Sequence, residues 1–355
     1  MRTFRTTTKL LALGVIAVLA ALLAVTVPAG AAKKQSSSEP VTLRLGYFPN
    51  VTHAPAIVGV EEKLFEKALG SNVTLELKTF NSGTEAIQAF QAGALDASYI
   101  GPSPTITAWS QFDKGVRIVS GAASGGAFFV VAPSINSAAD LEGKAVASPQ
   151  LGNTQDVALR AWLKSKGLNT DTSGGGDVQI RPQDNATTLN AFKTGEIVGA
   201  WVPEPWATRL VNEGGGKILV DEASLWPKGQ YVTTQLVVTS DYLEENKAVV
   251  QKLVNGQVAA NEFIKINPFD AQTDVSNNIA RITGKPIAGD LVIASFKNIT
   301  FTDDPIASSL AKNNKDASKI EGLTSADSLK GIYDLSFLNK ALKAAKQPTL
   351  PSPKL

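Results

Sequence analysis

The chain has 355 residues, of which 43% are hydrophobic, and this length is sufficient for two domains of ordinary size. It contains no cysteine and a single histidine, His53, which excludes disulfide scaffolds, thiolate nucleophiles, iron–sulfur clusters and the usual zinc sites. The 34 basic and 32 acidic residues nearly balance, which argues against nucleic-acid binding. We therefore expect a protein without metal or cofactor that binds a small polar ligand.

The first 31 residues have the pattern of a secretory signal peptide. Basic residues precede an apolar run over residues 10–25, and Ala29-Gly30-Ala31 follows it as a small-residue cleavage site. We predict cleavage near Ala31 and export to the periplasm or the cell surface. The alternative is an uncleaved membrane anchor, although the apolar run is shorter than the roughly 20 residues that span a bilayer. The chain has no cysteine that could carry a lipid anchor.

Strand and helix patterns alternate at the start of the mature chain. Residues 41–47, 73–80 and 96–100 read as strands, while residues 54–69 and the segment from about 82 to Gly93 read as helices. This order predicts an α/β protein with a mostly parallel sheet covered by helices. In such sheets ligands bind beyond the carboxyl ends of the strands, so the loops that follow strands are the candidate site.

A five-residue pattern occurs twice, 102 residues apart. Residues 89–93 (AFQAG) reappear as residues 191–195 (AFKTG), and each copy lies between two strand-like segments. The glycine of each copy fits a left-handed helix C-cap. We interpret the pair as a duplicated lobe, with a chance echo of helix, cap and strand as the alternative.

Two short β-branched segments, residues 128–132 and 235–239, enclose a stretch with its own β/α pattern. We predict that both cross between two lobes. Lobe one then comprises residues 41–127 and the largely helical residues 239–355, and lobe two comprises residues 128–238 with the crossing strands at its ends. The alternative is that the two segments are further core strands of a single sheet.

Several short motifs occur in an order that resembles the sulfonate/nitrate/taurine family of ABC transporter solute-binding proteins. They are Gly46-Tyr47-Phe48-Pro49-Asn50, His53-Ala54-Pro55, Asn81-Ser82-Gly83, residues 93–96, Gly101-Pro102-Ser103-Pro104, residues 140–144 and Glu204-Pro205-Trp206. The resemblance covers nearly the whole mature chain. It implies a two-lobed, type II periplasmic-binding-protein fold with two crossing strands as hinge. It also implies delivery of the ligand to a membrane permease driven by a cytoplasmic ATPase, and we expect a monomer.

One position departs from the family pattern. Val198 stands where the second repeat of the family often has an acidic residue, which puts the local capping in doubt more than the function. His53 precedes Ala-Pro near a predicted helix start, and we assign it to the core or to capping rather than to ligand contact.

Three predicted helix N-termini that follow strands could seat an anion. Free backbone N–H groups and the positive end of the helix dipole favour a sulfonate or carboxylate at such positions. The alternative is ordinary N-capping, which Ser, Thr and Asn favour in any helix. We favour ligand contact because all three starts follow strands. The candidate residues there are Ser82, Gly83, Thr84, Gly101, Ser103, Gly152, Asn153 and Thr154.

Aromatic and polar residues of the other loops complete the candidate site. Four aromatic side chains, those of Phe48, Tyr99, Trp201 and Trp206, could wall an organic tail, although aromatic residues at strand ends often belong to the core. Asn50 could donate from its amide or could terminate the turn. Glu204 could meet the ammonium group of a taurine-like ligand, or it could hold the lobes together by a hydrogen bond near the hinge, since an unpaired buried carboxylate is costly.

These residues predict an extracytoplasmic receptor that closes over a small organosulfonate, aliphatic or taurine-like, without a covalent step. Nitrate, bicarbonate and a thiamine-precursor pyrimidine are the alternative ligands. A secreted enzyme on the same fold is the second hypothesis, but the chain lacks a Gly-x-Ser-x-Gly elbow, paired histidine ligands and a phosphate loop. A sensor subunit that presents its closed form to a signalling partner is the third, and the sequence does not separate it from the first.

Overall fold

The computed structural model describes residues 40–353 and residue 355. The predicted signal peptide lies outside the described residues. Within the described part of the chain, no helix combines the length and the apolar character needed to cross a membrane.

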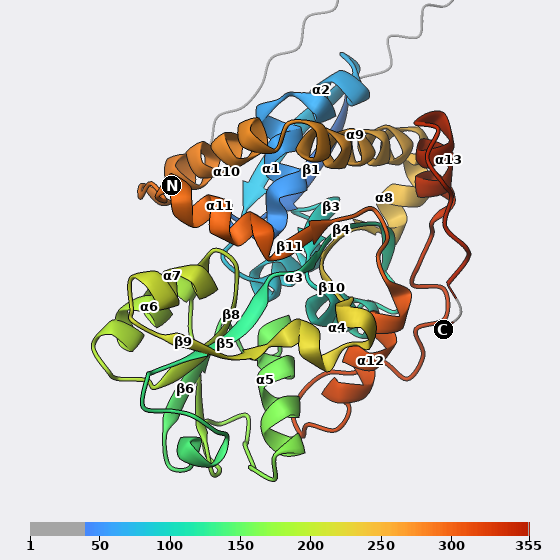
Figure 1. Cartoon of the computed structure of the whole chain (residues 1–355). Coiled ribbons are helices and arrows are strands. Elements are labelled where there is room, and N and C mark those ends of the chain that lie inside the picture. Colours follow the sequence, from blue (N-terminus) through green and yellow to red (C-terminus); the bar gives the residue numbers. More distant parts are fainter. Residues whose placement is uncertain (1–39, 354) are drawn as a thin grey trace, which may run out of the picture. The chain divides into compact units, whose positions relative to one another are not determined.

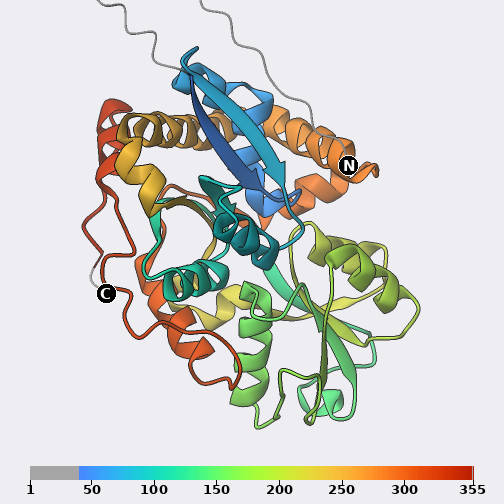
Figure 2. The same cartoon turned by 180° about the vertical axis from the view of Figure 1, so that it is seen from behind.

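The described chain is organised by two β-sheets (Figures 1 and 2). One sheet contains β1 (Val41–Tyr47), β2 (Val73–Thr79), β3 (Ala97–Ile100), β4 (Val116–Gly125), β10 (Val232–Thr239) and β11 (Ile299–Phe301), in the order β11-β4-β10-β3-β1-β2. The other contains β5 (Ala127–Val131), β6 (Ala145–Ser148), β7 (Gln179–Pro182), β8 (Gly199–Pro203) and β9 (Lys217–Asp221), in the order β7-β6-β8-β5-β9. We call each sheet with its helices the larger and the smaller lobe.

The helices divide between the two sheets. The larger lobe carries α1 (Ala54–Glu61), α2 (Leu64–Leu69), α3 (Gly83–Gln91), α4 (Pro102–Gln111), α8 (Ser240–Glu245), α9 (Lys247–Ile266), α10 (Pro268–Thr283), α11 (Gly289–Lys297), α12 (Ala307–Ala317) and α13 (Ser336–Ala344). The smaller lobe carries α5 (Thr154–Ser165), α6 (Asn185–Lys193) and α7 (Trp206–Asn212). Single 3₁₀ turns are η1 (Val51–His53), η2 (Ala139–Leu141), η3 (Glu222–Leu225) and η4 (Pro227–Gly229).

The predicted α/β class is confirmed, and parallel pairing dominates where the sequence alternates strand and helix. β1 pairs in parallel with β2 and with β3, and β6 pairs in parallel with β7 and with β8. Antiparallel strands complete both sheets, because β10 pairs with β3 and β4 while β5 pairs with β8 and β9. The alternative of a single continuous sheet does not hold.

Alternate residues of one strand pack on opposite faces of its sheet, as the period of two requires. In β3, Tyr99 packs with the core of α1 and α9, and Ile100 packs with that of α3 and α4. In β5, Phe129 packs with α5, and Phe128 packs with α6 and α7. Helices therefore cover both faces of each sheet.

The helix predicted over residues 54–69 is interrupted. α1 ends at Glu61 and α2 begins at Leu64, because Lys63 lies in the left-handed region with φ of +54°. The interruption folds α2 back so that the Phe65 ring lies against Gly59, where any Cβ would overlap the ring. The apolar pattern continues through the break, so the pattern alone did not reveal it.

The two copies of the five-residue pattern adopt the same turn. Gly93 and Gly195 end α3 and α6 with φ of +65° and +77°. The residue after each glycine closes the turn with a backbone hydrogen bond. Ala94 N–H donates to Ala89 O at 2.8 Å, and Glu196 N–H donates to Ala191 O at 2.9 Å. Each copy then enters a central strand, β3 or β8.

The chain passes between the sheets at two places. β4 leads into β5 through Gly125 and Gly126, so the predicted segment 128–132 lies directly after the first passage. The chain returns through η3 and η4, and the predicted segment 235–239 lies within β10 of the larger sheet. The lobe boundaries given above remain a prediction.

Candidate functional site

A cavity of about 30 Å³ lies between the two lobes, and we call it the cleft cavity. The larger lobe lines it with Phe48, Asn50, Thr52, His53, Asn81, Gly83, Gly101, Pro104 and Thr233. The smaller lobe lines it with Pro149, Asn153, Thr154, Gln155, Asn185 and Pro203. The described lining residues include no Asp, Glu, Lys or Arg, so the cleft cavity is polar but carries no fixed charge.

Five helices begin at the cleft cavity. They are α1, α3, α4, α5 and α6, and they follow β1, β2, β3, β6 and β7, so the cavity lies beyond the carboxyl ends of parallel strands. The lining residues at these starts are His53, Gly83, Gly101, Asn153, Thr154 and Asn185. The first-turn N–H groups and the helix dipoles make this a region of positive potential without a cationic side chain.

Two residues that line the cleft cavity each have a buried polar atom without a hydrogen-bond partner among the described residues. The atoms are Oγ1 of Thr154 and Oδ1 of Asn185, whose residues are 3% and 7% exposed. A buried polar atom left without a partner costs about 1–3 kcal/mol. Their position at two helix starts in the smaller lobe is that expected of groups that meet a ligand.

A buried ion pair holds the loop that presents Thr154. Asp156 accepts hydrogen bonds from the Ser148 hydroxyl at 2.7 Å and from Gly152 N–H at 2.9 Å, and Arg160 Nε lies 2.9 Å from its carboxylate. Both charged side chains are fully buried. Asp156 and its buried partners therefore hold the turn between β6 and α5 in place.

His53 lies in the cleft cavity and is neutral. Burial lowers its pKa to about 3, its ring stacks on Phe48 at 4.4 Å, and its Nδ1 accepts the Phe48 N–H at 3.3 Å. With Nδ1 as acceptor, the proton of the neutral ring is on Nε2, which is then a donor. The role predicted for His53 is core packing or capping. His53 precedes α1, but its side chain makes no capping hydrogen bond.

Hydrogen bonds join the lobes across the cleft. The Trp206 indole N–H donates to Asn50 Oδ1 at 3.0 Å, and the Ser82 hydroxyl donates to Gln150 Oε1. Gly101 lies against Thr154, and a Cβ at Gly101 would overlap Oγ1 of Thr154. The lobes therefore meet closely at the predicted helix starts.

The structure brings six of the predicted site residues together in the lining of the cleft cavity: Phe48, Asn50, Gly83, Gly101, Asn153 and Thr154. Ser82 lies beside them as the N-cap of α3, Thr84 is the second residue of α3, and Gly152 bonds to Asp156. Asn153 also caps α5, because its side chain accepts the Gln155 N–H at 3.3 Å. Ligand contact and N-capping are thus compatible there.

Ser103, Trp201 and Trp206 do not line the cleft cavity, and neither does Tyr99, which packs in the core of the larger lobe. Ser103 is buried, and its hydroxyl donates to Asn313 Oδ1 of α12 at 2.6 Å. Trp201 is in the core of the smaller lobe, stacked on Phe129, with its indole N–H donating to Glu222 at 2.7 Å. Trp206 lies at the edge of the cleft, where it contacts Asn50.

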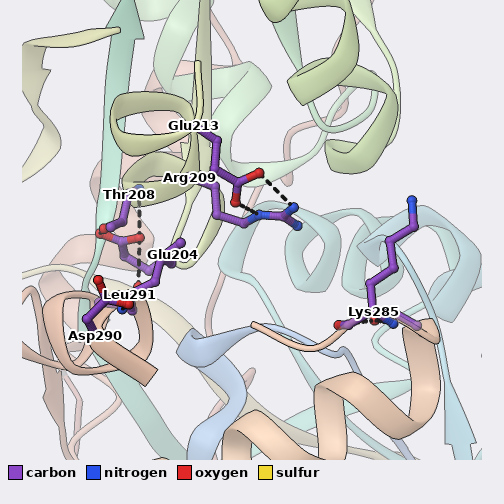
Figure 3. Close-up of polar contacts among 9 residues, drawn as sticks. Glu204, Thr208, Arg209, Glu213, Lys285, Asp290 and Leu291 are labelled. Atoms are coloured by element: carbon purple, nitrogen blue, oxygen red, sulfur yellow. Dashed lines mark hydrogen bonds and ion pairs between the residues drawn. The ribbon is translucent and has the colours of Figure 1, made fainter. Parts of the chain in front are cut away.

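Glu204 is buried at the end of β8, and both of its carboxylate oxygens have partners. Oε1 accepts from the Thr208 hydroxyl and the Asn298 amide, each at 2.7 Å. Oε2 accepts from Thr208 N–H at 3.1 Å and from the Ser295 hydroxyl at 3.2 Å. Figure 3 shows Glu204 beside Thr208. These bonds join α7 of the smaller lobe to α11 and the residue after it in the larger lobe. The arrangement favours a lobe-holding role over contact with a ligand ammonium group.

Asn185 lines the cleft cavity, although it is not among the site residues predicted from the sequence. Asn185 lies 102 residues after Gly83, and each of the two residues begins the helix of its repeat. The internal repeat could therefore have identified Asn185 as the counterpart of Gly83. Thr233, by contrast, reaches the cleft cavity from β10, and no local pattern marks it. Among residues 40–353 and 355, no group of three or more His, Asp or Glu side chains is placed to hold a metal ion.

The chain resembles known proteins in sequence and in fold. A model of the NMT1-like family matches residues 36–281. The taurine-binding periplasmic protein of Escherichia coli (strain K12) is 27% identical over 235 residues, which are 65% of this chain and 70% of that protein. The alkanesulfonate-binding protein SsuA from Xanthomonas axonopodis pv. citri, bound to MOPS, superposes with a TM-score of 0.66 at 17% identity, over 80% of this chain and 93% of that one.

The periplasmic nitrate-binding protein NrtA from Synechocystis PCC 6803 superposes with a TM-score of 0.70 at 16% identity, over 87% of this chain and 90% of that one. The two structural similarities show a shared fold and confirm the predicted fold class.

Proposed function

Since the chain belongs to the NMT1-like family, we propose that it is an exported solute-binding protein of an ABC importer that binds a small organosulfonate in the cleft cavity. It would deliver this ligand to a membrane permease driven by a cytoplasmic ATPase. The family and its named relatives are ligand-binding transport proteins and not enzymes. The names of the taurine-binding and alkanesulfonate-binding relatives support the sulfonate class.

The observation that carries the proposal is the convergence of five helix N-termini on one uncharged cavity. A sulfonate spreads one negative charge over three oxygens, so several neutral donors suit it. Each helix terminus stabilises a nearby anion by about 0.3–1 kcal/mol, and each hydrogen bond to a charged group contributes about 1.5–3 kcal/mol. The Thr154 hydroxyl and the Nε2–H of His53 add side-chain donors, and Asn185 contributes the first backbone N–H of α6.

The same geometry explains capture and release. Gly83 and Gly101 belong to the larger lobe, whereas Thr154 and Asn185 belong to the smaller lobe, so an anion that contacts both stabilises the closed form. Opening of the lobes about the two connections near Gly125 and residues 222–229 separates these donors. Binding and release then need no covalent step.

The test is a titration of the mature protein with ethanesulfonate, taurine, nitrate, bicarbonate and a pyrimidine, followed by calorimetry and by the melting temperature. We expect the sulfonates to raise the melting temperature in proportion to RT ln(1 + [L]/Kd). Thr154→Val, which removes one donor, should weaken ethanesulfonate at least about tenfold. Thr107→Val is the matched control, because its hydroxyl bonds within α4 to Ser103 O at 3.2 Å.

Three results would contradict the proposal. Stabilisation by nitrate or bicarbonate but by no sulfonate would show that the ligand is an inorganic anion and not an organosulfonate. Equal losses of ethanesulfonate affinity in Thr154→Val and Thr107→Val would show that the ligand does not bind in the cleft cavity. The absence of any sulfonate effect would overturn the sulfonate assignment.

A further inference from the structure

A second cavity, of about 260 Å³, adjoins the cleft cavity, and we call it the side cavity. It lies between α6 and α7 of the smaller lobe and the end of α10 with the following turn in the larger lobe. Asn50, Asn81 and Asn185 line both cavities. These three amides therefore form a wall that the two cavities share.

Both lobes contribute apolar side chains to the side cavity. Leu189 and Trp206 contribute from the smaller lobe, and Ile279, Ile282 and Ile287 contribute from the larger lobe. Leu189, Ile279 and Ile287 are buried within the protein at 4%, 3% and 8% exposure. The cleft cavity, by contrast, offers mainly amides, hydroxyls and glycines.

The charged groups around the side cavity are largely engaged within the protein. Arg209 bonds to Glu213 through two nitrogens, at 2.6 and 3.2 Å, and its guanidinium lies over the Trp206 ring at 4.8 Å. Asp184 caps α6 by accepting Thr187 N–H at 2.9 Å. Lys285 is exposed and stands on the opposite side of the gap from Arg209 (Figure 3). The lining is thus mixed, with apolar side chains in one part of it and amides, the Thr283 hydroxyl and these charged groups in the rest.

We propose that the side cavity is a subsite for the aliphatic substituent of the bound sulfonate. The anionic head occupies the cleft cavity and the carbon chain extends between Asn50, Asn81 and Asn185 to the isoleucines. The protein then prefers alkanesulfonates of several carbons to ethanesulfonate and taurine. This inference rests on the proposed function, because it needs a sulfonate head in the cleft cavity.

The test measures calorimetric affinity for ethane-, butane- and hexanesulfonate in the mature wild-type protein. Burial of one methylene group tightens affinity about fourfold. The dissociation constant should therefore fall from ethane- to butane- to hexanesulfonate. Ile282→Ser places a hydroxyl among the apolar side chains of the side cavity and should reduce the gain from ethane- to hexanesulfonate at least about fivefold while leaving ethanesulfonate within twofold. Ile282→Ala should give an intermediate dependence.

Ile293→Ser is the matched control. Ile293 lies on α11, is 39% exposed, and does not line the side cavity, so the chain-length dependence should persist in this variant. Melting curves of all variants check that each is folded, and Ile282→Ala supplies the comparison if the serine variant does not fold.

The outcomes separate the two proposals. Equal affinity for ethane- and hexanesulfonate in the wild type would overturn the subsite while the proposed function stands. An unchanged dependence in both Ile282 variants would also overturn the subsite. A failure of every sulfonate to bind would overturn the proposed function and the subsite with it.

Discussion

At the scale of single residues, His53 connects the stability of the fold to the site. Its ordinary pKa of 6.5 falls to about 3 because the ring is buried. Between these values the unfolded chain binds a proton that the folded chain does not, so His53 makes the folded state less stable as the pH falls. Glu222, whose pKa is raised to about 7 by burial, acts in the opposite direction between pH 4.5 and 7.

The corresponding prediction compares the wild type with His53→Gln. Each pH unit below 6.5 should cost the wild type up to about 1.4 kcal/mol through this residue, or about 2–3 kcal/mol at pH 4.5. The difference in unfolding free energy between wild type and variant should therefore shift by that amount between pH 7.5 and 4.5. Urea unfolding at several pH values measures it, and the contribution of Glu222 cancels because both proteins contain it. Parallel stability curves would show that His53 is accessible to protons in the folded state.

At the scale of elements, the two βαβ repeats, β2-α3-β3 and β7-α6-β8, have the same arrangement. α3 and α6 each start at the cleft cavity, with Gly83 and Asn185, and each end in a left-handed glycine. A difference appears just before the central strands. Asp96 bonds to Arg44 through both carboxylate oxygens, at 2.9 and 2.6 Å, whereas Val198, 102 residues later, has no side chain that could do so. The backbone N–H of each residue nevertheless donates to the neighbouring strand, so the backbone at Val198 follows the same course as that at Asp96.

This equivalence predicts matched effects of Gly93→Ala and Gly195→Ala. A Cβ at either position meets no atom within 4 Å, so the cost is only that of the left-handed backbone, about 1 kcal/mol. Both variants should lose this amount in urea unfolding, and both should bind ligand as the wild type does. A loss in one variant and none in the other would mean that the two turns are not equivalent in solution.

At the scale of the whole molecule, closure depends on how closely the lobes meet at Gly101. Its φ of −75° suits any residue, and its neighbour across the cleft is Oγ1 of Thr154. A methyl group there would act as a wedge between the lobes without disturbing the backbone of either lobe. Gly289 offers a contrast, because nothing lies within 4 Å of a Cβ at that position.

We therefore predict that Gly101→Ala weakens ligand binding at least about tenfold and leaves the unfolding free energy of the ligand-free protein within about 1 kcal/mol. Small-angle scattering should show contraction on addition of ligand in the wild type and in Gly289→Ala, and a smaller contraction in Gly101→Ala. Wild-type affinity and contraction in Gly101→Ala would show that the lobes do not meet at this point when ligand is bound.

The candidate site was predictable where it depended on local chemistry. The sequence predicts Gly83, Gly101, Asn153 and Thr154 at helix starts because polar or glycine residues after a strand mark such starts. The structure places all four in the lining of the cleft cavity. Ser103 has the same local signature, yet its hydroxyl faces α12, more than 200 residues away in sequence. Whether such a hydroxyl turns to the cleft or to another helix depends on a partner that the local pattern does not contain.

By itself, the sequence determined the α/β class, the order of the first strands and helices, and the glycine turns of both repeats, because periodicity and turn preferences act over a few residues. Only the tertiary structure decided that five helix starts meet at one uncharged cavity, that Trp201 belongs to the core, and that Glu204 joins the lobes. These outcomes depend on packing and hydrogen bonds between residues tens to hundreds of positions apart, where burial and partner availability outweigh local preference.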